Sequence, residues 1–69
     1  MKYIPGTKFI NNTTRQTRLF KRGVTYKLSN IKFLDDQYEY TFILPDRTLK
    51  SVKFESIEIA DEFLQNIVV

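Results

Sequence analysis

The chain has no cysteine and no histidine among its 69 residues. Without cysteine there are no disulfides, no thiolate metal ligands and no thiol nucleophile, which is consistent with a reducing compartment. Without histidine the chain lacks the commonest general base and the commonest ligand of transition metals. We therefore expect a protein that is not an enzyme and that holds neither a metal nor another cofactor.

Long apolar runs are lacking too. Residues 1–6 contain no apolar stretch long enough for a signal peptide. No segment reaches the roughly 18 to 20 apolar residues that a membrane span needs. The sequence thus predicts a cytoplasmic protein that does not enter a membrane, folded as a single domain over residues 1–69.

Acidic residues are missing from the first half of the chain. All eight Asp and Glu residues lie at or beyond Asp35, whereas eight of the 11 Lys and Arg residues lie at or before Lys32. Residues 1–34 therefore carry a net charge of +8 and residues 35–69 a net charge of −5. Such segregation favours a protein that binds a charged partner over one that catalyses a reaction.

Glycine and proline are scarce, with two of each, and they fall where turns are expected. After Gly23 every second residue from 24 to 28 is apolar, which predicts a strand with one buried face. The alternation slips by one at Ser29-Asn30 and resumes at Ile31. A phase change of this kind inside a long strand indicates a β-bulge or a sharp bend.

The remaining pattern predicts two more strands and a helix. Residues 38–44 and 49–54 are the strands, bounded by turns at 35–37 and 45–47. Ser56 is a residue type that caps helices, and apolar residues follow it at helical spacing, although 67–69 also suit a closing strand. We expect a mainly β fold, a small bent antiparallel SH3-like barrel with one short C-terminal helical turn. Over residues 23–60 the pattern resembles the SH3-like barrels common among very small phage proteins.

The basic first half contains a candidate phosphate-binding surface, because Lys and Arg neutralise phosphates and release counterions. The residues assigned to this surface are Arg15, Lys21, Arg22 and Lys27, and Arg18, Lys8 and Lys32 lie near them in the sequence. Stacking faces between the charges, as in barrels that bind single strands, would come from Phe20, Tyr26 and Phe33. An alternative stays open, since Lys27 or Lys32 opposite Glu39 would merely form cross-strand charge pairs.

The segment Gln16-Thr17-Arg18-Leu19-Phe20 resembles the Gln-x-x-Leu-Phe peptide by which bacterial polymerases and repair proteins dock on the replication sliding clamp. In that mode the glutamine bonds at the pocket rim, while leucine and phenylalanine fill an apolar pocket. We assign partner binding to Gln16, Arg18, Leu19 and Phe20. The alternative is that Leu19 or Phe20 belongs to the core, since adjacent residues of a strand face opposite ways.

The chain's size, its barrel pattern and this segment together resemble the small proteins with which lytic phages seize the host sliding clamp. The resemblance implies a non-enzymatic inhibitor of DNA replication that acts in the host cytoplasm through protein–protein contact, its acidic half mimicking DNA. The net charge of +3 departs from a DNA mimic, which is normally acidic. Two alternatives are a basic nucleic-acid-binding barrel and a structural phage protein that assembles through its sheet edges. Segregated charge and unsealed edges also predict a homodimer.

Overall fold

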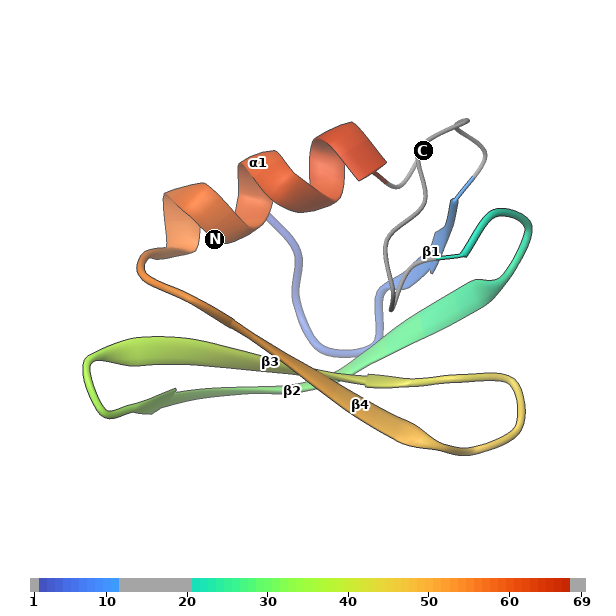
Figure 1. The fold of residues 1–69 in the computed structure, drawn as a ribbon, viewed down its shortest axis with the longest axis horizontal. Helices are drawn as coiled ribbons and strands as arrows, with labels where there is room; N and C mark the ends of the chain where they lie inside the picture. The colour runs from blue at the N-terminus through green and yellow to red at the C-terminus, as the bar shows by residue number, and fades with distance from the viewer. Residues whose placement is uncertain (1, 12–20, 68–69) are drawn as a thin grey trace.

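The computed structural model describes residues 2–11 and 21–67. Within them four antiparallel strands form one sheet in chain order, and a single helix follows (Figure 1). Their bounds are β1 Lys8–Ile10, β2 Thr25–Leu34, β3 Gln37–Ile43, β4 Leu49–Phe54 and α1 Ile57–Ile67. The predicted mainly β fold with one short C-terminal helix is confirmed. The helix has 11 residues and so makes about three turns rather than the single turn expected.

The long strand β2 contains the β-bulge that the sequence predicts. The register with β3 shifts between Leu28, which pairs with Phe42, and Asn30, so Ser29 is the extra residue. Because of this shift, Leu28 before the bulge and Ile31 after it both pack on the core side, although their spacing is odd. A bulge also bends its strand, and the sheet curves beneath α1 (Figure 1).

Two tight turns join β2 to β3 and β3 to β4 at the predicted positions. Asp35 and Asp36 form the first turn with φ angles of 53° and 60°, both positive as a type I′ turn requires. In the second turn the Arg47 amide donates to the Leu44 carbonyl at 2.9 Å. Pro45 occupies the position after Leu44, where proline is favoured in such turns. These turns fix which residues of the three strands lie opposite one another.

Helix α1 lies across the concave side of the sheet (Figure 1). Its N-terminus is capped as predicted, because the Ser56 hydroxyl accepts a hydrogen bond at 3.1 Å from the amide three residues later. Ala60 and Leu64 are fully buried beneath the helix. Ile67 ends the helix, so a closing strand is wrong at that residue, and residues 68–69 lie outside the described part of the chain.

The core between helix and sheet is mostly aromatic. Phe9 and Phe42 meet edge to face with ring centroids 6.1 Å apart, as do Tyr40 and Phe54 at 5.4 Å. This geometry suits the ring quadrupoles, and burial of each large apolar side chain contributes about 1.5–3 kcal/mol. The buried hydrophobic residues are Phe9, Tyr26, Leu28, Tyr40, Phe42, Phe54, Ala60 and Leu64.

The N-terminal residues tie the helix to the sheet. The Gly6 amide donates to the Leu28 carbonyl at 2.7 Å, and the Lys2 amide donates to Asp61 Oδ2 at 3.0 Å. The Lys2 ammonium also donates to Gln65 Oε1 at 2.8 Å. The concave side of the sheet is thus occupied by core, helix and N-terminal segment. On its outer face, the described residues of the sheet are mainly exposed or half-buried.

Candidate functional site

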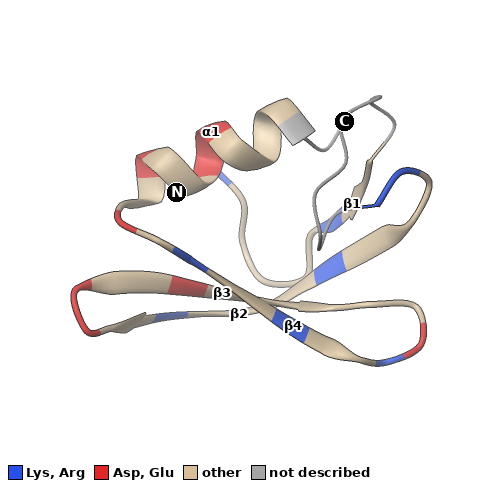
Figure 2. Ribbon diagram, viewed as in Figure 1, with Lys and Arg blue, Asp and Glu red and all other residues tan. Residues whose placement is uncertain are grey.

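Lysines gather on the outer face of the sheet, on the side away from α1. Lys27, for example, lies between the fully buried Leu28 and the almost fully buried Tyr26, so its side chain points outward. Acidic residues surround the helix instead (Figure 2). The outer-face lysines are Lys8, Lys27, Lys32 and Lys53, and the acidic residues of the helical side are Glu55, Glu58, Asp61 and Glu62. The helical side thus carries four of the eight acidic residues, while the other four, Asp35, Asp36, Glu39 and Asp46, belong to the sheet and its turns.

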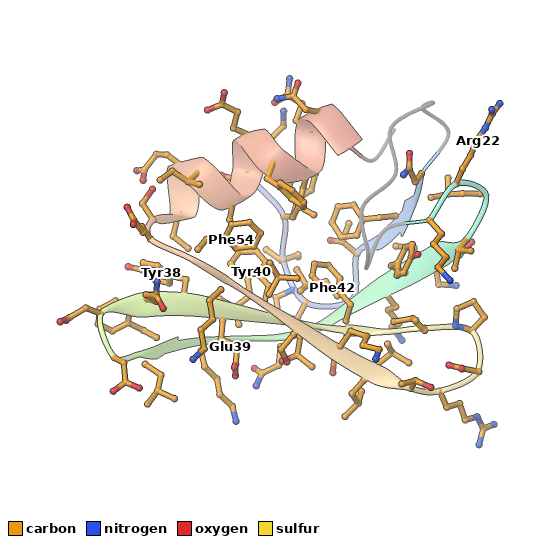
Figure 3. All side chains as sticks on the ribbon, in the orientation of Figure 1. Arg22, Tyr38, Glu39, Tyr40, Phe42 and Phe54 are labelled. Carbon is orange, nitrogen blue, oxygen red and sulfur yellow. The ribbon has the colours of Figure 1, made fainter. Side chains whose placement is uncertain are left out.

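One row of outer-face charges alternates in sign across the sheet. Lys32 on β2 lies directly opposite Glu39 on β3, which lies opposite Lys53 on β4. Figure 3 shows Glu39 on the side of the sheet away from the helix. Opposite charges in facing strand positions stabilise a sheet. We name Lys32, Glu39 and Lys53 the compensated row. Of the two lysines that the sequence allowed opposite Glu39, the register places Lys32 there and not Lys27.

A second row on the same face is not neutralised. Lys8 on β1 lies directly opposite Lys27 on β2, and Lys27 lies opposite Ile43 on β3 rather than opposite Glu39. Ile43 in turn lies opposite Leu49, whose side chain is 61% exposed. Across these four described strands the row holds no carboxylate. We name Lys8, Lys27, Ile43 and Leu49 the uncompensated row.

The uncompensated row is electrostatically unfavourable in the isolated protein. Like charges in directly facing strand positions repel and destabilise a sheet. An anion seated between Lys8 and Lys27 would remove that repulsion and gain two charge-assisted contacts. The apolar half of the row, Ile43 and Leu49, would at the same time offer a surface to a neutral part of the same ligand.

Two hollows lie beside this row, on either side of the turn between β3 and β4. The smaller, of about 260 Å³, opens on the outer face, and we call it the outer depression; its lining is Lys8, Thr25, Lys27, Ile43, Leu44 and Pro45. The larger, of about 420 Å³, is here called the Lys50 pocket; its lining is Lys21, Val24, Tyr26, Leu44, Pro45, Asp46 and Lys50. Leu44 and Pro45 belong to both, so these two residues form the ridge between them.

The polar groups of the Lys50 pocket are held by short hydrogen bonds. The Lys21 amide donates to the Tyr26 hydroxyl at 2.6 Å, which fixes the phenol in the wall. The Thr48 amide donates to Asp46 Oδ1 at 2.9 Å. Hydrogen bonds from the Thr48 side chain and backbone lower the pKa of Asp46, so this carboxylate is ionised at neutral pH. The pocket thus presents two ammonium groups, one carboxylate and an apolar wall.

The residues predicted from the sequence are only partly placed by the structure. Arg15 and the docking residues Gln16, Arg18, Leu19 and Phe20 lie outside the described residues. Lys27 belongs to the uncompensated row and Lys21 to the Lys50 pocket. Arg22 lies in the turn before β2, where Gly23 has a φ of 79°, and Figure 3 shows its side chain extending outward. Lys21 and Lys27 are therefore brought to one end of the sheet.

Two of the three predicted stacking residues, Tyr26 and Phe33, do not lie between the lysines as expected from the sequence. Tyr26 is 1% exposed, and its ring belongs to the core. Phe33 is 61% exposed, but it pairs with Tyr38 at a ring distance of 4.8 Å and faces the opposite side of the sheet from Lys32. Phe20, the third, lies outside the described residues. The idea that Tyr26 and Phe33 interleave with the lysines is wrong, because strand alternation sends neighbouring residues to opposite faces.

Sequence reasoning placed Lys8 near the phosphate-binding surface but missed the other residues beside Lys27. Ile43, Leu49 and Lys50 were not assigned to a site, although the alternation around Tyr26 and Phe42 already predicts that Lys27 and Ile43 face outward. Only the register brings Ile43 and Leu49 into one row with Lys8 and Lys27, since the four residues come from four strands.

No group of three or more metal-ligating side chains comes together among residues 2–11 and 21–67. In the same part of the chain, no helix has both the length and the apolar character to cross a membrane. Comparison of the chain with protein-family models, with curated proteins and with solved structures gave no match.

Proposed function

We propose that this protein is a non-enzymatic binding protein of the cytoplasm that holds nucleic acid by its phosphates, on the outer face of its sheet. The observation that carries the proposal is the uncompensated row, where Lys8 and Lys27 face each other without a carboxylate beside the apolar Ile43 and Leu49. Phosphates are the anions that nucleic acids present in series, and lysines bind them with release of counterions. The net charge of +3 supports the same class of partner.

The compensated row provides a matched control for this proposal. The double variant Lys8→Gln/Lys27→Gln removes two positive charges that have no carboxylate opposite them. The double variant Lys32→Gln/Lys53→Gln removes two positive charges from the same face, but both lie opposite Glu39. Net charge falls equally in the two variants, so any difference between them reports the position of the lost charges.

Binding to DNA is measured by fluorescence anisotropy between about 50 and 200 mM salt, where phosphate contacts lose affinity steeply. We expect Lys8→Gln/Lys27→Gln to lower the slope of log affinity against log salt by about 1.5 to 2. The control pair should lower it by clearly less. The first variant should also unfold at a slightly higher denaturant concentration, because the cross-strand repulsion is worth a few tenths of a kcal/mol or more. Equal slopes for the two variants, or no binding at low salt, would overturn the proposal.

A second candidate function rests on the segment 16–20. We propose as the alternative that Gln16, Leu19 and Phe20 dock on the host replication sliding clamp and that the protein inhibits replication there. The described residues on either side support a docking segment, because the Gly23 amide donates to the Asn11 carbonyl at 2.8 Å. This bond holds both ends of the connection between β1 and β2 at one point of the sheet edge.

The docking alternative is tested with Leu19→Ala and Phe20→Ala. Anchor truncations commonly cost about 2 kcal/mol or more, so clamp affinity should fall at least about thirtyfold for either variant. Gln16→Ala should cost less, since it removes one or two hydrogen bonds of about 1 kcal/mol each. All three variants should melt like the parent protein. Unfolded variants would indicate core residues, and folded variants with unchanged clamp binding would exclude the docking role.

A further inference from the structure

The Lys50 pocket shares two lining residues with the outer depression, which contains the lysines of the proposed phosphate-binding row. The outer depression contains Lys8 and Lys27, the Lys50 pocket contains Lys21 and Lys50, and the ridge of Leu44 and Pro45 lines both hollows. A ligand that follows the uncompensated row towards the β3–β4 turn therefore reaches the pocket directly across this ridge. Four lysines are thus distributed along one path around the end of the sheet.

The lining of the Lys50 pocket suits a flat, polar-edged ring better than a phosphate. Val24, Leu44 and Pro45 provide an apolar wall, and the almost fully buried Tyr26 closes the floor, where its hydroxyl accepts a hydrogen bond from the Lys21 amide. The volume of about 420 Å³ lies within the roughly 300–1,000 Å³ of small-molecule sites. The ammonium groups donate and the Asp46 carboxylate accepts at the rim, which matches the mixed donors and acceptors on the edge of a nucleobase.

We propose that the nucleic acid bound by this protein is single-stranded, and that one of its bases enters the Lys50 pocket while neighbouring phosphates lie on Lys8 and Lys27. The inference rests on the proposed function of the outer face. A duplex keeps its bases stacked and paired, so it offers phosphates to the lysines but no base to the pocket. A single strand offers both, because its bases are already unpaired.

The proposal is tested with three probes of equal length, about ten nucleotides, which lies within the roughly 4–16 nucleotides that small single-strand-binding folds cover. The first is a single strand of mixed sequence, the second is the same backbone with abasic residues throughout, and the third is the duplex of the first. The abasic strand keeps its phosphates and loses only the groups that the pocket would bind. We expect the complete strand to bind about tenfold more tightly than either of the other probes.

A pocket-filling variant and a matched lysine pair locate this preference in the structure. Val24→Phe places a larger side chain in the pocket and should remove the preference for bases without weakening binding of the abasic strand. Lys50→Gln should reduce the preference, whereas Lys53→Gln, on the same strand but in the compensated row, should leave it unchanged. If Val24→Phe melts at a lower temperature than the parent protein, the comparison of Lys50→Gln with Lys53→Gln still shows whether the preference for bases depends on the pocket.

Failure of this inference is distinguishable from failure of the proposed function. Equal affinity for the three probes, with a salt dependence that still requires Lys8 and Lys27, would overturn the base pocket and leave phosphate binding in place. A preference for bases that survives both Val24→Phe and Lys50→Gln would also overturn the pocket. No binding of any probe at low salt would overturn both.

Discussion

Tyr40 is fully buried in the core cluster that also contains Ala60 and Leu64 of α1, and its hydroxyl has no hydrogen-bond partner among the described residues. Asp61 Oδ1, on the facing helix, is also buried without one. Burial raises the pKa of Tyr40, and the charges of Asp61 and Tyr38 raise it further. The phenol is therefore neutral in the folded protein at neutral pH, and no hydrogen bond from residues 2–11 or 21–67 offsets the desolvation of its hydroxyl.

Replacing Tyr40 with phenylalanine is expected to stabilise the protein. The ring and its contact with Phe54 are kept, while a buried hydroxyl without a partner is removed. Such groups cost about 1–3 kcal/mol, so the free energy of unfolding should rise by about 1 kcal/mol in urea titrations at neutral pH. A fall of similar size would mean that a bound water or a rearranged Asp61 satisfies the hydroxyl in solution.

Alkaline pH should increase the difference in the free energy of unfolding between the parent protein and Tyr40→Phe. The ordinary pKa of tyrosine, 10.0, applies to the unfolded chain, and the pKa of Tyr40 in the folded protein is higher. Above pH 10.0 the unfolded state loses this proton first, so the free energy of unfolding decreases as pH rises. Tyr40→Phe should show a smaller decrease than the parent in urea titrations on either side of that pH. Parallel curves would contradict the raised pKa.

Asp36 is held in a backbone conformation that side chains disfavour, with φ at 60°. Type I′ turns favour glycine at this second position, because glycine has no Cβ to strain. Asp36→Gly should therefore raise the free energy of unfolding by about 0.5–1 kcal/mol in urea. The reverse change, Gly23→Ala, serves as a control. It introduces a Cβ at φ 79° where no heavy atom lies within 4 Å, so it should destabilise through the backbone alone.

At the scale of the element, β2 depends on its bulge for its bend. Deleting Ser29 would leave Tyr26, Leu28 and Ile31 in regular alternation on the core face, opposite the same residues of β3. The deletion would remove only the local bend that a bulge introduces, and with it part of the fit between the sheet and α1. We therefore expect the deletion variant to keep cooperative thermal unfolding but to melt at a lower temperature than the parent protein, and loss of cooperative unfolding would contradict this account. Ser29→Ala should change the free energy of unfolding by less than about 0.5 kcal/mol, because Ser29 is exposed.

At the scale of the whole molecule, the positions of the lysines and the acidic residues predict how copies of the protein would associate. The lysines of the outer face and the acidic residues around α1 lie on opposite sides of the molecule (Figure 2). Contact between the basic side of one copy and the acidic side of another is head to tail, and such contacts do not close into a pair unless the rotation permits. The homodimer expected from the sequence remains a prediction, and the geometry favours an open series of copies instead.

We expect sedimentation at low salt to show an average mass that rises with concentration beyond that of a dimer. About 1 M salt should restore the monomer, because it screens charges beyond roughly 3 Å. A dimer that persists at high salt would indicate pairing of sheet edges instead. A monomer under every condition would exclude both forms of association.

The sequence alone determined the features that depend on neighbouring residues. The bulge at Ser29, the two turns and the cap at Ser56 were all predicted, because each follows from a backbone preference or a side-chain period over a few residues. The mainly β fold with its C-terminal helix follows from the same local patterns.

Tertiary structure decided which distant residues meet. Lys27 faces outward by its period, yet only the register places Lys8 and Ile43 beside it and leaves Glu39 to Lys32. Tyr26 carries the same aromatic ring as a stacking residue, yet its position inside the core removes it from that role. A local pattern sets the face on which a side chain lies. Its neighbours across the sheet depend on turn geometry and on the shift at the bulge, summed over the whole length of the strands.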